Sequence, residues 1–268
     1  MLSDQIEGLA SIDTWHWFFR ARRLLIDDAL HRLGIERDGR HTVLDVGCGP
    51  GGTTAMLAAV GPVTAIDPSP VAGRYLSERV PDATFHLGGL DDLDELLGGR
   101  TFDLVCCFGA LNQASVPDPS AAVGRLAATV APGGGLLIDE PADERLRRQI
   151  DLSGSSVRRF ELEDLTGSVR SSGLHVVDAR YVHGWAWPIA RLLAWQSRRR
   201  PKPADHPPTE LANRSLDRAA YQFARLEHAA ARRGVRPPRG TGCWVVARRG
   251  TEPALRRPGT GAVARDGG

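Results

Sequence analysis

The stretch TVLDVGCGPGG at residues 42–52 constrains the fold more strongly than any other part of the sequence. Its first half, which includes Val43, Leu44 and Val46, is mostly apolar and β-branched and so favours a strand. Its second half contains four glycines and one proline within six residues. Glycine adopts positive φ angles and lets a ligand approach the backbone closely. A strand that enters such a turn ahead of a helix is typical of a site for a nucleotide or a nucleoside.

A carboxylate follows this turn at an informative distance. Asp67 ends the apolar run VTAID, 18 residues after Gly49. A carboxylate at the tip of the second strand, about 20 residues past the glycine turn, is placed to accept hydrogen bonds from both hydroxyls of an adenosine ribose. Two charge-assisted hydrogen bonds of about 1.5–3 kcal/mol each make Asp67 the predicted ribose anchor.

The order of residues in the turn distinguishes between two ligands. A dinucleotide turn reads G-x-G-x-x-G and directs a helix N-terminus at a pyrophosphate. Here the order is Asp45-x-Gly47-x-Gly49-x-Gly51. An acid at the start of the turn repels a pyrophosphate but suits the ammonium group of an aminoacyl arm. The turn therefore favours a nucleoside with an amino-acid arm, and an NAD-dependent oxidoreductase remains as the less favoured alternative.

Short apolar runs alternate with helix-compatible segments over the next hundred residues. Strands followed in turn by helices are typical of an α/β protein whose parallel sheet is covered on both faces. Two further strand candidates, at 174–182 and 242–249, flank a helical stretch. The predicted strands of the alternating part are 42–46, 62–66, 83–87, 102–108 and 135–139, and the predicted helices are 53–60, 70–79, 91–97 and 119–130.

Four motifs in chain order resemble those of the class I S-adenosylmethionine-dependent methyltransferases. They are VLDVGCGPG, VTAIDPS, FDLVCCFGALNQ at 102–113 and LAATVAPGGGLLI at 126–138. The resemblance implies a Rossmann-like, seven-stranded and mostly parallel sheet with helices on both faces and a helical insertion before the last strand. It also implies S-adenosyl-L-methionine as the cofactor. The activity it implies is methyl transfer to a small-molecule acceptor, such as a specialised metabolite or a glycan or lipid precursor.

The resemblance to a bacterial small-molecule subgroup, the methyltransferase type 11-like proteins, extends towards both ends of the chain. WHWFFRARRLLI at 15–26 is similar to its N-terminal aromatic-arginine helix, and VRRFELEDL at 157–165 to a stretch before another helix. HGWAWPIARLL, with Asn213, Glu227 and Pro237-Pro238-x-Gly240, resembles the insertion before the last strand. The organisation expected is an N-terminal helical lid (1–40), the cofactor-binding core (41–183), a helical insertion that caps the acceptor (184–240), the last strand (241–250) and a disordered tail (251–268).

The resemblance assigns a set of residues to the cofactor. Asp67 holds the ribose, the Gly47–Gly51 turn the aminoacyl end, and Leu90-Asp91 the adenine. The family often carries an acid after the third-strand glycine, where this chain has Gly88-Gly89-Leu90. The next carboxylate, Asp91 or Asp92, is therefore expected to receive the adenine amino group. The full set is Trp17, Arg22, Asp45, Gly47, Cys48, Gly49, Gly51, Asp67, Pro68, Gly89, Leu90, Asp91, Phe108, Gly109 and Gln113.

The N-terminal aromatic cluster gives two of these residues their expected roles. Aromatic faces around Trp17 can lie against a sulfonium, and Arg22 can reach the methionine carboxylate. The alternative is a helix that packs its aromatic residues on the sheet.

Candidate catalytic residues are His16, Glu140 and His183. Methyl transfer from a sulfonium is an in-line displacement, so it needs chiefly the alignment of nucleophile and methyl group. A general base is required only where the nucleophile is protonated. Many relatives carry Asp-x-Leu-Glu-His after the fourth strand, where this chain has Gly109, Leu111, Asn112 and Gln113. Because this chain lacks that histidine, a second possibility stays open. In it, the protein binds the cofactor but transfers no methyl group, and acts as a cyclase or a partner-binding protein.

Composition limits the remaining possibilities. No apolar run reaches the roughly 18 residues that a membrane span needs, and the N-terminus lacks the features of a signal peptide, so a cytoplasmic protein is expected. The four cysteines suit a reducing compartment and show no CxxC spacing. They are predicted to be small buried residues, and no metal site is predicted.

Charge is unevenly distributed along the chain. From Gly184 onward there are 17 basic and 6 acidic residues, although the whole chain carries only +2. This asymmetry points to an anionic partner, such as a phosphorylated substrate or a lipid head group, or to a solvated arginine-rich surface; nucleic acid is not expected. The stretch WPIARLLAWQSRRR is amphipathic with a basic end, which suits a membrane surface, packing on its own domain or a dimer contact. Of these, packing on the same domain or across a dimer is the preferred interpretation, so a monomer or homodimer is expected.

Overall fold

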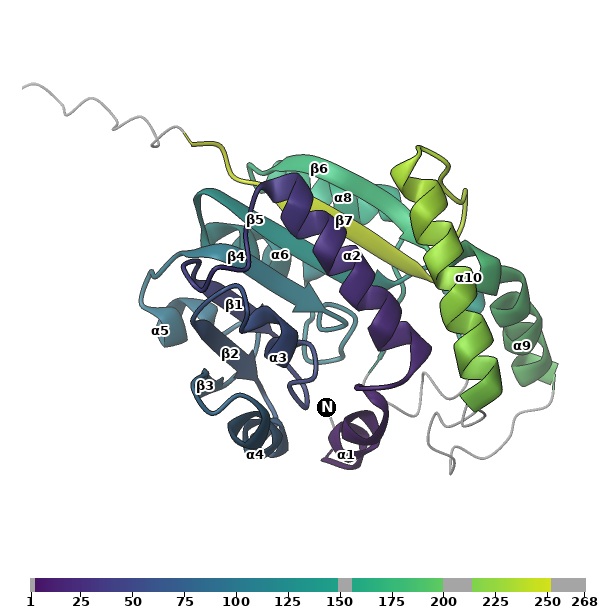
Figure 1. The fold of residues 1–268 in the computed structure, drawn as a ribbon, viewed down its shortest axis with the longest axis horizontal. Coiled ribbons are helices and arrows are strands. Elements are labelled where there is room, and N and C mark those ends of the chain that lie inside the picture. Colours follow the sequence, from purple (N-terminus) through teal and green to yellow (C-terminus); the bar gives the residue numbers. More distant parts are fainter. Residues whose placement is uncertain (1–2, 149–155, 200–213, 252–268) are drawn as a thin grey trace, which may run out of the picture.

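A single seven-stranded sheet organises the chain in the computed structural model, which describes residues 3–148, 156–199 and 214–251 (Figure 1). The strand order is β3-β2-β1-β4-β5-β7-β6. Neighbouring strands are parallel from β3 to β5, whereas β7 runs antiparallel to both β5 and β6. The prediction of a Rossmann-like, mostly parallel sheet is confirmed. The strands are β1 (Val43–Val46), β2 (Val63–Asp67), β3 (Thr84–Leu87), β4 (Phe102–Phe108), β5 (Val130–Pro141), β6 (His175–Val182) and β7 (Gly242–Arg248).

Helices cover both faces of this sheet (Figure 1). The helices before the last strand are α1 (Ser3–Ile12), α2 (Trp17–Leu33), α3 (Thr54–Leu57), α4 (Pro70–Arg79), α5 (Leu93–Leu97), α6 (Pro119–Ala128), α8 (Leu162–Ser171), α9 (Trp187–Arg199) and α10 (Arg214–Arg232), with short 3₁₀ turns η1 (Glu144–Leu146) and η2 (Gly184–Ala186). Among the described residues, no helix is long and apolar enough to cross a membrane.

Alternation along the strands sends side chains to two separate cores. Leu44 and Val46 of β1 belong to the core that α5, α6 and α8 cover, whereas Val43 belongs to the core beneath α2. Successive strand residues point to opposite faces, so one buried strand supplies both layers. The cysteines follow the same rule, since Cys107 faces one core and Cys106 the other. All four cysteines are buried and unpaired, as predicted.

Two predicted segment limits need correction. The predicted strand at 135–139 extends over Val130–Pro141, and the Pro-Gly-Gly-Gly stretch lies within it. Gly133 has a φ of 80°, and the pairing with β4 shifts between Phe102 and Leu104, so the glycines form an irregularity in the strand and not a turn before it. The helix predicted at 53–60 is a single turn, Thr54–Leu57.

The N-terminal segment, which was expected to form a lid, also contributes α2 to the hydrophobic core. Leu25, Ile26, Ala29 and Leu30 of α2 are buried against strand residues in the second core, and Figure 1 shows α2 lying across the sheet. Leu9 of α1 and Phe19 and Arg22 of the first two turns of α2 lie near Asp45 and Gly47, at the carboxyl end of β1. The Pro-rich linker at 201–208, Asn213 and the predicted disordered tail beyond Thr251 lie outside the described residues.

Candidate functional site

Two adjoining hollows lie at the carboxyl ends of β1, β2 and β4. Each encloses about 460 Å³, counting the solvent at its mouth. Gly47 lines both of them. They are placed where the chain leaves β1 for β2 on one side and reaches β4 on the other, which is the switch point of an open α/β sheet. Ligands of such sheets bind at this point.

Gly47 keeps the junction of the two hollows open. Its φ is 78°, and its N–H donates to the carbonyl oxygen of Ile66 at 2.8 Å. A Cβ at this position would lie 2.7 Å from the Cβ of Ala110. The positive φ and this close approach both require glycine. A side chain at residue 47 would therefore intrude on the wall of the first hollow, at the residue that both hollows share.

Asp67 is the fixed anion of the first hollow, which it lines at the end of β2. Its Oδ1 accepts from the Ser69 N–H at 2.9 Å, and its Oδ2 accepts from the Gly49 N–H at 3.0 Å. Burial raises the pKa of this carboxyl, and the two N–H donors oppose that rise. Each carboxylate oxygen has a second acceptor position, so the group is held rigidly and can still receive two hydroxyls.

The remaining wall of the first hollow combines small and apolar surfaces with one unsatisfied amide. Gln113 donates from Nε2 to Gly109 O and to Asn112 Oδ1, but its buried Oε1 has no partner among the described residues. A buried acceptor without a donor is costly, so a ligand donor in this hollow would satisfy it. The other lining residues are Val46, Pro68, Gly88, Gly89, Leu90, Gly109, Ala110, Ser115 and Val116.

The second hollow carries charges of both signs. Asp45 accepts from Thr54 Oγ1 at 2.6 Å, and burial raises the pKa of Asp45 to about 6. Arg22 donates from Nε to Asp139 Oδ2 at 2.8 Å, and its guanidinium lies 4.7 Å from the ring centre of Phe18. Both Asp45 and Arg22 line the hollow. An amino-acid zwitterion carries an ammonium group and a carboxylate, so it needs one anionic and one cationic partner, here Asp45 and Arg22.

Twelve of the fifteen residues assigned to the cofactor line one of the two hollows. The three exceptions are Trp17, Gly51 and Asp91. Gly51 packs against α4 and not against a hollow. Its φ is 82°, and a Cβ there would lie 2.9 Å from Leu76 of α4.

Asp91, which was expected to contact adenine, lies outside the lining of the first hollow. The carboxylate of Asp91 pairs with Arg125 of α6, and the side chain is 51% exposed. The alternative, Asp92, accepts from the Gly89 N–H at 2.8 Å. Neither carboxylate lines the first hollow. The long-range partner on α6 draws Asp91 away, which the local motif does not reveal.

Trp17 lies in an aromatic cluster next to α10 and not on the cofactor side. Its backbone N–H donates to Asp217 Oδ1 at 2.6 Å. Its indole ring is 5.0 Å from the His183 ring and 5.2 Å from the Trp185 ring. Packing against α10 therefore replaces the expected contact with a sulfonium, and Phe19 occupies the wall of the second hollow instead.

None of the three candidate bases lines either hollow. His16 caps α2, because its Nδ1 accepts from the Phe18 N–H at 3.4 Å. Burial lowers the pKa of His16, and the lone pair of the neutral ring is already used in this cap. His16 lines neither hollow.

Glu140 holds the loop after β4 instead of facing a hollow. Its Oε1 accepts from the N–H groups of Ala110 at 3.0 Å and Leu111 at 2.8 Å. Burial raises the pKa of Glu140 to about 8, so the group is mostly protonated at neutral pH. A protonated carboxyl cannot act as a base, and this geometry makes Glu140 a support for the wall that contains Ala110.

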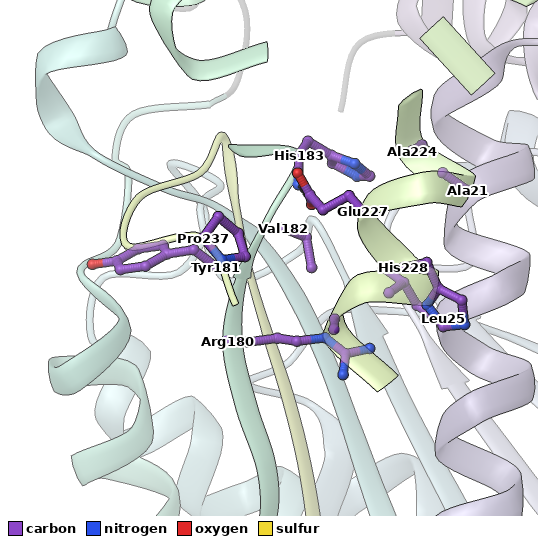
Figure 2. A pocket seen from close by; sticks show the side chains of 11 residues that line it. Ala21, Leu25, Arg180, Tyr181, Val182, His183, Ala224, Glu227, His228 and Pro237 are labelled. Atoms are coloured by element: carbon purple, nitrogen blue, oxygen red, sulfur yellow. Dashed lines mark hydrogen bonds between the residues drawn. The ribbon is translucent and has the colours of Figure 1, made fainter. Parts of the chain in front are cut away.

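His183 follows β6 in a left-handed conformation, with a φ of 59°. Its backbone N–H donates to Glu227 Oε1 at 2.5 Å, and Figure 2 shows this carboxylate of α10 beside the end of β6. Burial lowers the pKa of His183 to about 4. The ring is 3% exposed and lines a small cavity between α2, β6 and α10, apart from the two hollows.

Several residues of the site carry no sequence signal. Leu9 and Asp13 enter the second hollow from the α1 region, and a Cβ on Gly52 would collide with the Asp13 carboxylate. Ser115 and Val116 enter the first hollow from the loop after β4. Asp139, the partner of Arg22, had one available signal, because it immediately precedes Glu140 at the end of a predicted strand.

The order of the strands, the glycine turn and the two joined hollows define a class I S-adenosylmethionine-dependent methyltransferase fold. S-adenosyl-L-methionine is the cofactor of this class, and the site fits it through the rigid Asp67 carboxylate, the unsatisfied Gln113 oxygen and the two hollows that adjoin at Gly47.

A family model described as a methyltransferase domain matches residues 18–195, and the chain belongs to this family. The chain is 34% identical over 119 residues to a trans-aconitate 2-methyltransferase of Delftia acidovorans, which covers 41% of this chain and 43% of that protein. It is 37% identical over 101 residues to a ubiquinone biosynthesis O-methyltransferase of Xanthomonas axonopodis pv. citri, which covers 36% and 41%. The chain thus spans about two fifths of the length of these curated relatives.

A solved structure extends the similarity of the fold over most of the chain. A putative sarcosine dimethylglycine methyltransferase from Galdieria sulphuraria superposes with a TM-score of 0.56 at 15% identity, covering 87% of this chain and 86% of that one. Agreement at this low identity concerns the fold alone.

Proposed function

We propose that this protein transfers the methyl group of S-adenosyl-L-methionine to a small organic acceptor. The observation that carries the proposal is the pair of hollows joined at Gly47, one with the Asp67 carboxylate and the other with Asp45 and Arg22. Asp67 would receive the ribose hydroxyls, and Leu90 and Pro68 would contact the adenine. Asp45 suits the ammonium group of the amino-acid arm and Arg22 its carboxylate. When bound, the cofactor supplies an electrophilic methyl group.

Positioning, not proton removal, is the proposed contribution of the protein to the reaction. Alignment of nucleophile and electrophile can supply about 7–11 kcal/mol of the barrier. None of the candidate bases lines a hollow, since His16 caps α2, Glu140 accepts from backbone N–H groups and the buried His183 ring packs on Trp17. The acceptor atom should therefore be unprotonated at neutral pH before it binds, as in a carboxylate or an acidic hydroxyl.

The two relatives support an acceptor of this kind. One is named for trans-aconitate, a carboxylic acid, and the other is named as an O-methyltransferase. Transfer to an oxygen atom of an anionic small molecule is thus the reaction that we favour for this chain.

The cofactor assignment is tested by calorimetry with S-adenosylhomocysteine. We expect binding at sub-millimolar concentration or tighter, and at least tenfold weaker binding after Asp67→Ala. Asp91→Asn is the matched control, because Asp91 pairs with Arg125 outside the hollow. This variant should bind like the wild type. The assignment fails if the wild type does not bind, or if Asp67→Ala binds as well as the wild type.

The reaction is tested with a methyl-labelled cofactor and a panel of carboxylic acids and phenols. Label in the product is the expected result. An altered but unlabelled product would favour the alternative in which the fold binds cofactor without methyl transfer. Hydride exchange with a nicotinamide cofactor, together with no affinity for S-adenosylhomocysteine, would favour the oxidoreductase.

A further inference from the structure

The outer surfaces of α9 and α10 are unusually apolar. Eleven large hydrophobic side chains are exposed in the described part of the chain, and seven of them lie on these two helices. Leu226 is 67% exposed and Ile189 is 58% exposed. A concentration of exposed apolar side chains in one place marks an interaction site more often than scattered ones do. We call this surface the cap face; it consists of Ile189, Leu192, Leu193, Trp195, Leu216, Phe223 and Leu226.

The helix α10 has two apolar surfaces, one of small buried residues and one of large exposed residues. Ala220, Ala224 and Ala231 are buried on the side of α10 that faces α2. Leu216, Phe223 and Leu226 recur at intervals of seven and three residues on the other side, where they remain exposed. The packing on α2 uses Ala220, Ala224 and the half-buried Tyr221 of α10. Leu216, Phe223 and Leu226 remain mostly exposed to solvent among the described elements.

The helix α9 repeats this arrangement. Ala194 is fully buried, whereas Ile189, Leu192 and Leu193 are exposed. Both α9 and α10 contact η2, and the Trp185 ring of η2 stacks on Phe223 at 5.6 Å. Figure 1 shows the two helices at the same end of the molecule, beyond the β6 edge of the sheet.

Within α9 and α10 themselves, the exposed charged side chains are all basic. The two acids in these helices point inward, because Asp217 is 3% exposed and Glu227 accepts from the His183 and Trp185 N–H groups. The guanidinium of Arg199 lies 3.9 Å from the ring centre of Trp195, at the end of α9. The basic residues of the two helices are Arg191, Arg198, Arg199, Arg214, Arg218, Arg225 and Arg232.

We propose that the cap face docks on an anionic phospholipid surface, with α9 and α10 lying in the plane of the headgroups. Interfacial helices combine an exposed apolar side with arginines that meet anionic headgroups. A second copy of the chain is a poorer occupant, because an isologous contact would oppose the arginines of one copy to those of the other without an exposed acid on either helix. The helices follow β6 at the carboxyl edge of the sheet, so docking would place the site's edge near the lipid.

Vesicle flotation with the full chain tests this proposal. We expect the wild type to float with vesicles of equal parts phosphatidylglycerol and phosphatidylcholine at low salt. It should float at least fivefold less with phosphatidylcholine alone, and less again in 0.5 M salt, because surface electrostatics are screened. The variant L192S/L226S should lose most of its flotation. Leu87→Ser is the matched control, since Leu87 is 57% exposed on β3 at the opposite edge of the sheet.

The charge contribution is tested separately with R218Q/R225Q, which should weaken binding to anionic vesicles and reduce its salt dependence. Thermal unfolding and S-adenosylhomocysteine binding establish that each variant is folded; neither measurement depends on lipid. The proposal is overturned if the wild type does not float with anionic vesicles, or if L192S/L226S floats as well as Leu87→Ser. Absence of flotation with a dimer in sedimentation velocity that L192S/L226S abolishes would assign the face to a second copy.

Discussion

Single residues decide whether the cofactor site is open and how its wall is held. Gly47 lies where the two hollows adjoin, and Glu140 accepts from the N–H groups of Ala110 and Leu111, on the side of Ala110. The hollow is therefore shaped by a missing side chain on one side and a buried carboxyl on the other. Both residues can therefore affect the reaction through the shape of the site, without contact with the reacting groups.

Gly47→Ala should abolish cofactor binding while leaving the fold intact. The new Cβ would lie 2.7 Å from Ala110, where the hollows meet. We expect S-adenosylhomocysteine affinity to fall at least tenfold in calorimetry. Gly98→Ala is the control, because Gly98 also has a positive φ, of 56°, but a Cβ there would meet no atom within 4 Å and would lie outside the hollows. Both variants carry a backbone penalty of about 1 kcal/mol, so equal binding losses would contradict the steric explanation.

Glu140 should make the protein less stable as the pH rises from about 5 to 8. Its pKa is raised from an ordinary value of 4.5 to about 8, so the folded state retains a proton that the unfolded state loses. Stability from this group is complete below pH 4.5 and is lost as the pH approaches 8, with a slope of up to about 1.4 kcal/mol per pH unit.

Glu140→Gln isolates this effect, because a glutamine oxygen can still accept from Ala110 and Leu111. The stability difference between the wild type and the variant, measured by denaturant unfolding at pH 5, 6.5 and 8, should move steadily in favour of the variant. Parallel pH profiles for the two proteins would mean that Glu140 is ionised in the folded state.

At the scale of elements, α2 connects the site to the C-terminal helices. Its first turns provide Phe19 and Arg22 to the second hollow, and its middle contributes Asp28 to a charged cluster with β6 and α10. Arg180 of β6 is at the centre of this cluster and points between β6 and α10 (Figure 2). It lies 2.8 Å from Asp178 and 3.3 Å from Asp28, with its side chain 1% exposed.

Arg180→Met should destabilise the protein by about 3 kcal/mol. Removing one partner of a buried ion pair typically costs about 3–5 kcal/mol. The lower end applies because Asp28 keeps Arg32 and Asp178 keeps Arg236. Denaturant unfolding measures the loss. Arg40→Met serves as the control, since the Arg40 side chain is 84% exposed in its pair with Asp38 and should change stability by less than about 0.5 kcal/mol. Equal effects of the two changes would contradict a structural role for the buried cluster.

At the scale of the whole molecule, the order of the elements was largely predictable from the chain. The strands β1 to β4 begin and end within about one residue of the predicted runs, because apolar alternation and glycine turns act over short distances. The glycine turn and Asp67 were predicted to form one site, and Gly49 and Asp67 are indeed hydrogen-bonded. A strand–turn–helix unit and the tip of the next parallel strand necessarily lie together, so their spacing in sequence is sufficient.

Side-chain partners were much less predictable. Asp91 and Trp17 were placed on the cofactor by their neighbours in sequence, yet Arg125 of α6 and Asp217 of α10 determine their positions. Likewise, α1 adds Leu9 to the second hollow without any motif. A carboxylate or an indole at the edge of a site takes the strongest partner within reach, and that partner can be far away in the chain.

The sequence by itself determined the sheet, the turn and the class of ligand, since each depends on backbone preferences and on residues that are close along the chain. Only the tertiary structure decided that Glu140 supports a wall, that Asp139 pairs with Arg22, and that α10 buries three of its alanines while exposing Leu226. Those outcomes depend on which distant surfaces meet, because burial and pairing are properties of the packed molecule and not of any local stretch.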